Sequence, residues 1–164
     1  MNTKATVYLE TTIPSYLSAK TSNNLIVAGE QMVTRQWWET RKDSFQLYIS
    51  DLVIQESSKG DASAAQRRLE LCNNLSLLEI DEDVISLTQL LLRSGLFPPK
   101  ASADAGHIAV ASKHSIDYLL TWNCKHIANA QLIRRISNIV SEAGYYVPLI
   151  CTPTELFEGQ SDDR

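Results

Sequence analysis

The chain has 164 residues, of which 44% are hydrophobic, and its 15 Lys and Arg against 19 Asp and Glu give a formal net charge of −4. This size suits one globular domain with a sizeable core, and the acidic balance argues against a protein that coats nucleic acid, which is usually basic. No apolar run approaches the ~20 residues of a membrane-spanning helix. The first residues have no apolar stretch typical of a signal peptide, so we expect no membrane association.

The cysteine content indicates a reducing compartment. The three cysteines are odd in number and form no C-x-x-C pair. We therefore expect reduced thiols and a cytoplasmic location.

The first half of the chain is predicted to alternate strands with helices. Residues 5–9 (ATVYL) are expected to form a buried strand, and Pro14 is expected to start a short helix that reaches Leu17. Residues 25–41 are expected to form a long helix, and residues 45–49 a second strand. Three further elements are predicted before residue 81: a helix capped by Ser50 or Asp51 and closed at Gly60, a helix begun by Asp61, and a strand over residues 75–80.

The second half continues the alternation. Ser102 is expected to be the N-cap of a helix that ends near Lys113, with Asp104 in its first turn. Before that helix, Asp81 is expected to cap another helix, which closes at Gly95. After it we expect a strand over residues 118–120, a helix over 128–142, a strand over 147–151 and a final helical turn from Thr152.

This order of elements predicts the fold class. Strands that alternate with helices are typical of a parallel sheet covered by helices on both faces. We therefore predict an α/β fold, a three-layer α/β/α sandwich with a mainly parallel sheet of about five strands. No repeat or linker divides the chain, so we expect a single domain over residues 1–157 and a polar tail over 158–164. Neither GxGxxG nor GxxxxGK[ST] occurs, which argues against nucleotide binding.

Four polar residues stand at element ends that a parallel sheet would bring to one edge. Glu10 follows the first strand, Glu56 lies in the helix after the second, Asp104 begins the central helix, and Asn123 follows the fourth strand. Three carboxylates and an amide are hard oxygen ligands of the kind that Mg²⁺ or Mn²⁺ prefers. Such a cation relieves carboxylate repulsion, activates a water molecule and neutralises phosphoryl charge.

The motifs around these residues resemble the PIN-domain family, metal-dependent ribonucleases typified by VapC toxins of toxin–antitoxin pairs. The matching stretches are VYLETTIPSYL, YISDLVIQE, SADAGHIAVA and YLLTWNCKHIAN, in the order of the family. Together with the elements between them, they cover nearly the whole chain. Glu10 stands where the family usually has its first Asp, Glu56 matches the helix Glu, Asp104 the third acid, and Asn123 a fourth Asp or Asn.

The resemblance implies an activity and its residues. The protein would hydrolyse RNA phosphodiester bonds by in-line attack of water, with one well-held Mg²⁺ and a second ion arriving with substrate. Glu10 and Asp104 would be the main metal ligands, Glu56 a ligand or base, and Asn123 a weak ligand. Thr11 and Thr121 resemble the family's hydroxyl residues beside the acids and are expected to meet the substrate. Apart from the resemblance, Lys125 is expected to meet a phosphate near the site, and a solvated turn is an equal alternative for it. An antitoxin partner and a homodimer are implied by the resemblance alone.

Several of these residues have a simpler interpretation. Asp104 at a helix start would favour the helix dipole without any catalytic role. His107 lies one turn beyond Asp104, where a histidine bonded to a neighbouring element is preferred to a metal ligand. Trp122 is well placed to stack on a base, whereas Trp37 and Trp38 are expected to pack in the core or at an interface.

Two other functions compete with the ribonuclease. The longer side chain of Glu10 and the missing charge at Asn123 also fit a degenerate PIN-like module that binds RNA or protein without cutting. A nuclease for structured DNA is less favoured, because the chain has no evident arch or clamp for a duplex.

Overall fold

The structure is a computed structural model that describes residues 3–157, and all of its described strands belong to one parallel sheet. The strand order is β3-β2-β1-β4-β5, so the first strand of the chain lies at the centre. Val7 of this strand is aligned with Leu47 on one side and with Tyr118 on the other. The strands are β1 (Ala5–Leu9), β2 (Phe45–Ser50), β3 (Ser76–Leu78), β4 (Tyr118–Leu120) and β5 (Leu149–Cys151).

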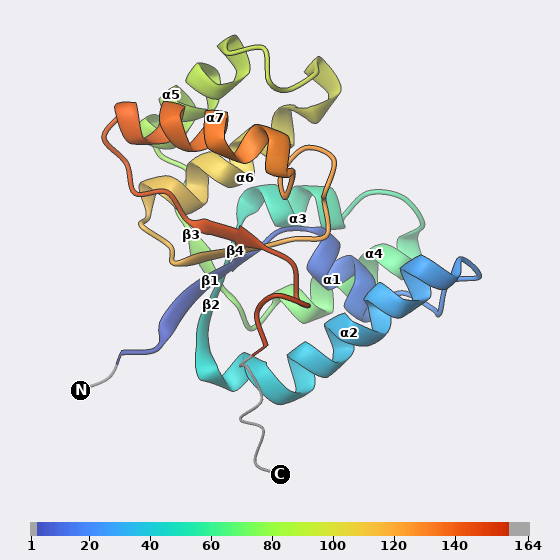
Figure 1. Ribbon diagram of the computed structural model, residues 1–164. Coiled ribbons are helices and arrows are strands. Elements are labelled where there is room, and N and C mark those ends of the chain that lie inside the picture. Colours follow the sequence, from blue (N-terminus) through green and yellow to red (C-terminus); the bar gives the residue numbers. More distant parts are fainter. Residues whose placement is uncertain (1–2, 158–164) are drawn as a thin grey trace.

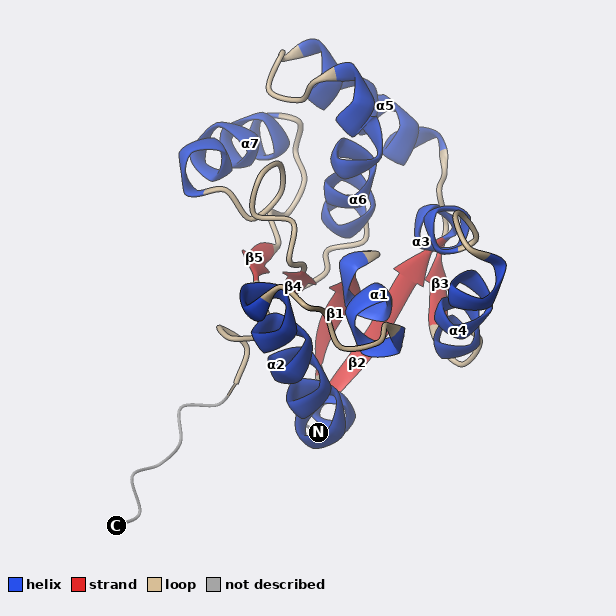
Figure 2. Ribbon diagram, turned by 90° about the vertical axis from the view of Figure 1, so that its right-hand side faces the viewer, coloured by secondary structure: helices blue, strands red, loops and turns tan. Residues whose placement is uncertain are grey.

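Helices cover both faces of this sheet (Figures 1 and 2). One group contains α5, α6 and α7, and the other contains α1, α2 and α4. The three-layer α/β/α sandwich with a five-stranded parallel sheet is thereby confirmed. The helices are α1 (Thr12–Ser18), α2 (Leu25–Arg41), α3 (Asp51–Ser57), α4 (Ala62–Cys72), α5 (Glu82–Arg93), α6 (Ser102–Lys113) and α7 (Ala130–Glu142).

The path of the chain creates a switch point between β1 and β4. From β1 the chain moves outward through β2 to β3, and it then crosses back to β4 and moves outward in the opposite direction to β5. In open parallel sheets, ligands bind outside the carboxyl ends of the strands at such a reversal. Any residue that follows β1 or β4 directly therefore lies at the favoured ligand position of this fold.

The central strands are buried, as the lack of a polar face predicts. Leu9 and Leu120 are aligned across the β1–β4 pair and are almost fully buried. Trp37 of α2 is also fully buried, stacks on Phe45, and donates its indole N–H to the Leu156 carbonyl oxygen at 3.2 Å. This contact attaches α2 to the segment after β5.

A close helix contact brings α3 and α6 together at the carboxyl edge. Gly106 of α6 packs on Leu52 of α3 so closely that an added Cβ would lie 2.8 Å from Leu52 Cδ1. The end of the Leu52 side chain thus fills the space beside Gly106, and the two helices pack on each other here. Glu56, one turn beyond Leu52, and His107, next to Gly106, lie within hydrogen-bonding distance.

The expectation that Ser102 is an N-cap is wrong. A short 3₁₀ helix (Pro99–Ala101) precedes α6, and Ser102 already has helical dihedral angles, with φ −61° and ψ −34°. Because the chain is turning before Ser102, that residue lies inside the helix. Asp104 is in the first turn as predicted.

Other element boundaries differ by a few residues. The short helix starts at Thr12, two residues before Pro14, because a proline is tolerated within the first turn, where its missing N–H has no helical partner. The outer strands β3 and β5 are shorter than the predicted 75–80 and 147–151, since each pairs with only one neighbour over three residues. Helix α7 begins at Ala130 behind an Asn129 cap, and turns replace the final helix.

Two other expectations concern residues at the limits of the description. The polar tail, 158–164, lies outside the described residues. Among the residues that are described, none of the helices has the length and apolar character needed to cross a membrane. The cytoplasmic location stays a prediction.

Replacing Trp37 with Ala should reduce the free energy of unfolding by about 3–5 kcal/mol, because it empties a large buried site and leaves the Leu156 carbonyl without its donor. Urea unfolding measures the change. Gln36→Ala, an exposed neighbour on the same helix, is the control and should shift the value by less than about 0.5 kcal/mol. Equal effects of the two substitutions would contradict this packing.

Candidate functional site

The four predicted site residues lie around the switch point of the sheet. Glu10 directly follows β1, and its backbone N–H donates to the Leu120 carbonyl oxygen at 3.1 Å, which extends the β1–β4 pairing by one residue. Asn123 lies three residues beyond β4. Glu56 is in the last turn of α3, and Asp104 is in the first turn of α6.

Glu10 is a buried carboxylate, with 4% of its surface exposed. Three hydrogen bonds reach its Oε1 atom: from the Thr121 hydroxyl at 2.7 Å, from the Thr12 hydroxyl at 2.6 Å, and from the Thr12 backbone N–H at 3.2 Å. The Thr12 hydroxyl in turn accepts the Trp122 backbone N–H at 2.8 Å. The side chain of Glu10 is thus fixed between the loops that follow β1 and β4.

Glu56 is fixed through one oxygen as well. Its Oε1 accepts the Thr11 hydroxyl at 2.6 Å and lies 2.5 Å from His107 Nε2. His107 is fully buried, and its other ring nitrogen, Nδ1, lies 2.6 Å from the Tyr8 hydroxyl. The histidine is therefore bonded to neighbouring elements as preferred from the sequence, and both of its nitrogens are engaged within the protein.

The Tyr8 hydroxyl continues this connection to β2. It lies 2.7 Å from the Ser50 hydroxyl, and both residues are fully buried. Ser50 stands at the N-cap position of α3, but its side chain makes no capping hydrogen bond there. A line of hydrogen-bonding groups consequently runs from the sheet through His107 to Glu56.

Asp104 and Asn123 form the other side of the site. Asp104 is half-buried, and the Asn123 side chain is close enough to its carboxylate to lower the pKa of Asp104. The Asn123 Oδ1 atom also accepts the His126 backbone N–H at 3.0 Å. Asn123 therefore orders the turn after β4 beside Asp104.

Burial and neighbouring charges shift the acids in different directions. Burial raises the pKa of Glu10, more than His107 and the two threonine hydroxyls lower it. Burial also raises the pKa of Asp104, and the charge of Glu56 adds to that effect. For Glu56 burial acts in the same direction, but His107 and Thr11 outweigh it, so the pKa of Glu56 lies below its usual value. Glu56 is thus the acid that the protein itself keeps ionised.

The tyrosine of this network stays a neutral phenol. Burial raises the pKa of Tyr8 far above its ordinary value, and the charges of Glu10 and Glu56 raise it further. Its hydroxyl is therefore available as a hydrogen-bond donor at any physiological pH.

The donor chemistry of the site suits a hard divalent cation. The carboxylate and amide oxygens are the ligand types of Mg²⁺ and Mn²⁺. All hydrogen bonds that the described residues give to Glu10 and Glu56 reach Oε1, which leaves the second oxygen of each carboxylate to accept a cation. Two of the acids, Glu10 and Asp104, would be relieved by such a cation because burial disfavours their charge.

The acids do not yet surround a common point. Within residues 3–157, no three His, Cys, Asp or Glu side chains are arranged to hold a metal ion. The metal-ligand roles of Glu10, Glu56, Asp104 and Asn123 stay predictions.

The predicted substrate contacts have different surroundings. Thr11 contacts Glu56 and is half-buried, and Lys125 is exposed in the turn after β4. Thr121 is fully buried, donates to Glu10 and accepts the Asn123 backbone N–H at 2.9 Å, so its hydroxyl orients the site. All three substrate roles stay untested.

Trp122 is already engaged within the protein. Its ring stacks on Tyr16 with centroids 6.2 Å apart, and its indole N–H donates to the Thr34 hydroxyl at 2.7 Å. The ring therefore packs the loop after β4 against α1 and α2.

Three residues of the site were not identified from the sequence: Tyr8, Thr12 and Ser50. Tyr8 precedes Glu10 by two residues, so strand alternation places both on the same face of β1. This spacing was the available signal for Tyr8. Thr12 and Ser50 gave no comparable local signal, because their partners are distant in the sequence.

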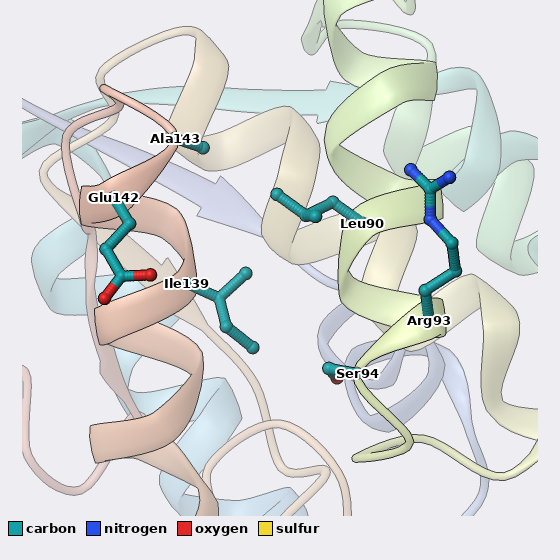
Figure 3. A pocket seen from close by; sticks show the side chains of 6 residues that line it. All are labelled: Leu90, Arg93, Ser94, Ile139, Glu142 and Ala143. Carbon is teal, nitrogen blue, oxygen red and sulfur yellow. The ribbon is translucent and has the colours of Figure 1, made fainter.

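An open groove between α5 and α7 lies apart from the acids (Figure 3). Leu90 and Ile139 face each other from its opposite walls, with Arg93 and Glu142 at its rim. None of the four predicted site residues lines it, so this hollow is not the candidate site.

Comparison with family models and with curated proteins finds no match to the sequence. The fold is nevertheless similar to that of a chain in the crystal structure of VapBC2 from Rickettsia felis bound to a DNA fragment from their promoter. The TM-score is 0.57 at 17% sequence identity, over 89% of this chain and 97% of that chain. The fold is PIN-like. The resemblance predicted from the sequence is confirmed at the level of this fold, over nearly the whole chain.

Two of the predicted site residues lie at the position where an open parallel sheet binds ligands. The β1–β4 switch point is where such a parallel sheet binds ligands, and Glu10 and Asn123 follow these two strands. Identity this low does not carry residue roles across, so the site rests on the geometry of this chain.

Thr12→Val should lower the free energy of unfolding by about 1–3 kcal/mol, since it leaves the Trp122 N–H without its acceptor and removes one donor from buried Glu10. Urea unfolding tests this. Thr40→Val makes the same isosteric change on the exposed surface of α2 and should have an effect below about 0.5 kcal/mol. If Thr12→Val is as mild as Thr40→Val, the Thr12 hydroxyl does not hold the two loops together.

Proposed function

We propose that the protein is a divalent-metal-dependent endoribonuclease that hydrolyses RNA phosphodiester bonds, and that it is the toxin of a toxin–antitoxin pair. The observation that carries this proposal is a buried acid, Glu10, fixed directly after the central strand at the switch point of a PIN-like sheet, with Glu56 and Asp104 on the helices α3 and α6 at the same edge. Burying a carboxylate costs free energy unless hydrogen bonds or a bound cation offset it. A buried acid at such a position is therefore a candidate for a functional residue. A structural loop residue at this position would not need that burial.

The residues of the site divide the chemistry among them. A divalent cation, when bound, lowers the pKa of a water molecule and neutralises charge on the phosphoryl group. Glu10 and Asp104 would hold it, because their carboxylates are buried or half-buried and their charged forms are the ones disfavoured in its absence. Glu56 stays ionised and would either ligate the cation as well or orient the attacking water and accept its proton.

The remaining polar groups support binding and orientation. Thr121 and Thr12 hold Glu10, and Asn123 lies beside Asp104 with its own oxygen partly engaged. Lys125 is exposed in the adjacent turn, where it would contact an RNA phosphate. Hydrolysis would proceed by in-line attack of water on the phosphodiester, with the leaving oxygen on the opposite side of phosphorus.

Asp104→Asn should reduce Mg²⁺- or Mn²⁺-dependent cleavage of RNA by at least about 100-fold, because groups that only support a metal ligand already cost 10–100-fold when removed. The fold should be retained, since Asp104 is half-buried and makes no capping bond. Cleavage of a mixed RNA pool measures the loss.

The matched control for this substitution is Asp83→Asn. Asp83 is also an acid in the first turn of a helix, but it is exposed on α5, away from the switch point. This variant should cleave as the wild type does. Full activity in Asp104→Asn would refute the assignment of the site.

A protein partner is the second part of the proposal. The N-terminal half of α2 exposes apolar side chains: 88% of Leu25, 74% of Ile26 and 61% of Met32. Such a surface is costly in water and is typical of a protein interaction site. The related fold was solved as VapBC2 bound to a DNA fragment from their promoter. We propose that an antitoxin binds this protein over α2, and that the protein forms a homodimer.

Ile26→Asp should weaken the complex with the antitoxin by at least about 10-fold, because it places a charge within the apolar contact. The product of the adjacent gene is the antitoxin to test, and calorimetric titration measures its affinity. Gln36→Asp, at an exposed polar position of the same helix, should bind normally. Unchanged affinity in Ile26→Asp would remove α2 from the interface.

A non-catalytic binding module is the competing function. The observation that favours it is the number of hydrogen bonds that already satisfy Glu10 within the protein. Titration with Mn²⁺ separates the two. Binding at millimolar ion together with RNA cleavage supports the nuclease, and the lack of both supports the module.

A further inference from the structure

The hydrogen-bonded line behind Glu56 begins with a defined donor. An ionised carboxylate only accepts hydrogen bonds, so His107 Nε2, at 2.5 Å from Glu56 Oε1, must carry a proton. The other ring nitrogen, Nδ1, lies 2.6 Å from the Tyr8 hydroxyl. The Tyr8 hydroxyl in turn lies 2.7 Å from the hydroxyl of Ser50.

This line is more extensive than a merely satisfied core histidine requires. Ser50, Tyr8 and His107 are all fully buried, and they come from β2, β1 and α6. Glu56, at the end of the line, has a side chain that is 29% exposed. The line therefore connects the buried centre of the sheet to an acid of the site that is partly open to solvent.

The contact is flanked by packing between α3 and α6. Gly106, next to His107, lies against the end of the Leu52 side chain of α3. The Thr11 hydroxyl holds the same Oε1 atom of Glu56 from the other side. With Oε1 held by two donors, the orientation of the carboxylate is fixed, and the second oxygen is kept for a cation or a water molecule.

We propose that His107 is a positioning residue, held by Tyr8 and Ser50, which fixes the Glu56 carboxylate for metal binding and for RNA hydrolysis. This role rests on the proposed nuclease function. His107 itself does not touch the cation, because both of its ring nitrogens are engaged.

The line can be observed directly, without metal or substrate. The chain has three histidines, so their ring signals are readily assigned in an NMR spectrum. His107 should carry a proton on Nε2, and this proton should exchange slowly. Glu56→Gln should shift the signal, and Tyr8→Phe should alter the Nδ1 resonance. A ring protonated on Nδ1 alone would overturn the proposal.

Two variants test the effect on the site. Tyr8→Phe removes the hydroxyl that is bonded to His107 Nδ1 and leaves the ring in place, whereas His107→Leu removes both bonds. Groups that support metal ligands typically contribute 10–100-fold to affinity or activity, so His107→Leu should weaken Mn²⁺ binding by about that factor. Tyr8→Phe should have a smaller effect in the same direction. Calorimetric titration with Mn²⁺ alone measures both.

The kinetic effect should fall on kcat rather than on KM for RNA, since Glu56 is oriented by the line while the RNA contacts are elsewhere. His107→Gln retains a donor near the Nε2 position and should recover part of the activity lost in His107→Leu. Ser112→Ala is the control: it removes another fully buried hydroxyl of α6, one bonded to the Ile108 carbonyl oxygen. This control should bind Mn²⁺ and cleave RNA normally.

The outcomes separate the two proposals. If wild type cleaves RNA but Tyr8→Phe and His107→Leu, both folded by circular dichroism, bind Mn²⁺ and cleave as wild type does, His107 has no positioning role and the nuclease assignment stands. If wild type neither binds Mn²⁺ nor cleaves RNA, the nuclease assignment fails, and the role of His107 in it fails too. Loss of kcat and of Mn²⁺ affinity with partial rescue by His107→Gln supports the proposal.

Discussion

The burial of a carboxylate at the end of the central strand is the constraint on which the site depends. Glu10 directly follows β1, beside which the order of the strands in the sheet reverses, and 4% of its surface is exposed. A charged group in that position requires donors, which Thr12 and Thr121 provide from the loops after β1 and β4. These bonds join the two loops, and they thereby fix the backbone at the edge of the sheet where Asp104 and Asn123 also lie.

The second acid is held by a different device. Glu56 lies on α3, which approaches α6 closely at Gly106, and His107 anchors its carboxylate from within the core. The two acids are thus fixed by separate sets of donors, one from loops and one from the sheet through a histidine. In the proposed nuclease, this division keeps one carboxylate ready to hold a cation and the other ionised to orient water.

The sequence was sufficient for the features that depend on local pattern. The apolar run of β1 and the alternation of strands with helices predicted the parallel sheet, and a parallel sheet places the residues after its strands at one edge. That reasoning predicted the positions of Glu10 and Asn123. It failed at Ser102, where a preference for capping residues was outweighed by the preceding 3₁₀ turn. It also missed Tyr8 and Ser50. Tyr8 is bonded to His107, which is 99 residues away in the chain, and to Ser50, which is 42 residues away, so only the tertiary fold brings these groups together.

The central claim is that Glu10 and Asp104 share a divalent cation at the switch point of the sheet. Crystals of the protein grown with Mn²⁺, measured at a wavelength where manganese scatters anomalously, test it most directly. We expect an anomalous peak within about 2.1 Å of an oxygen of each carboxylate, and the peak should disappear in Asp104→Asn. A wild-type crystal at millimolar Mn²⁺ with no peak between these two residues would contradict the claim.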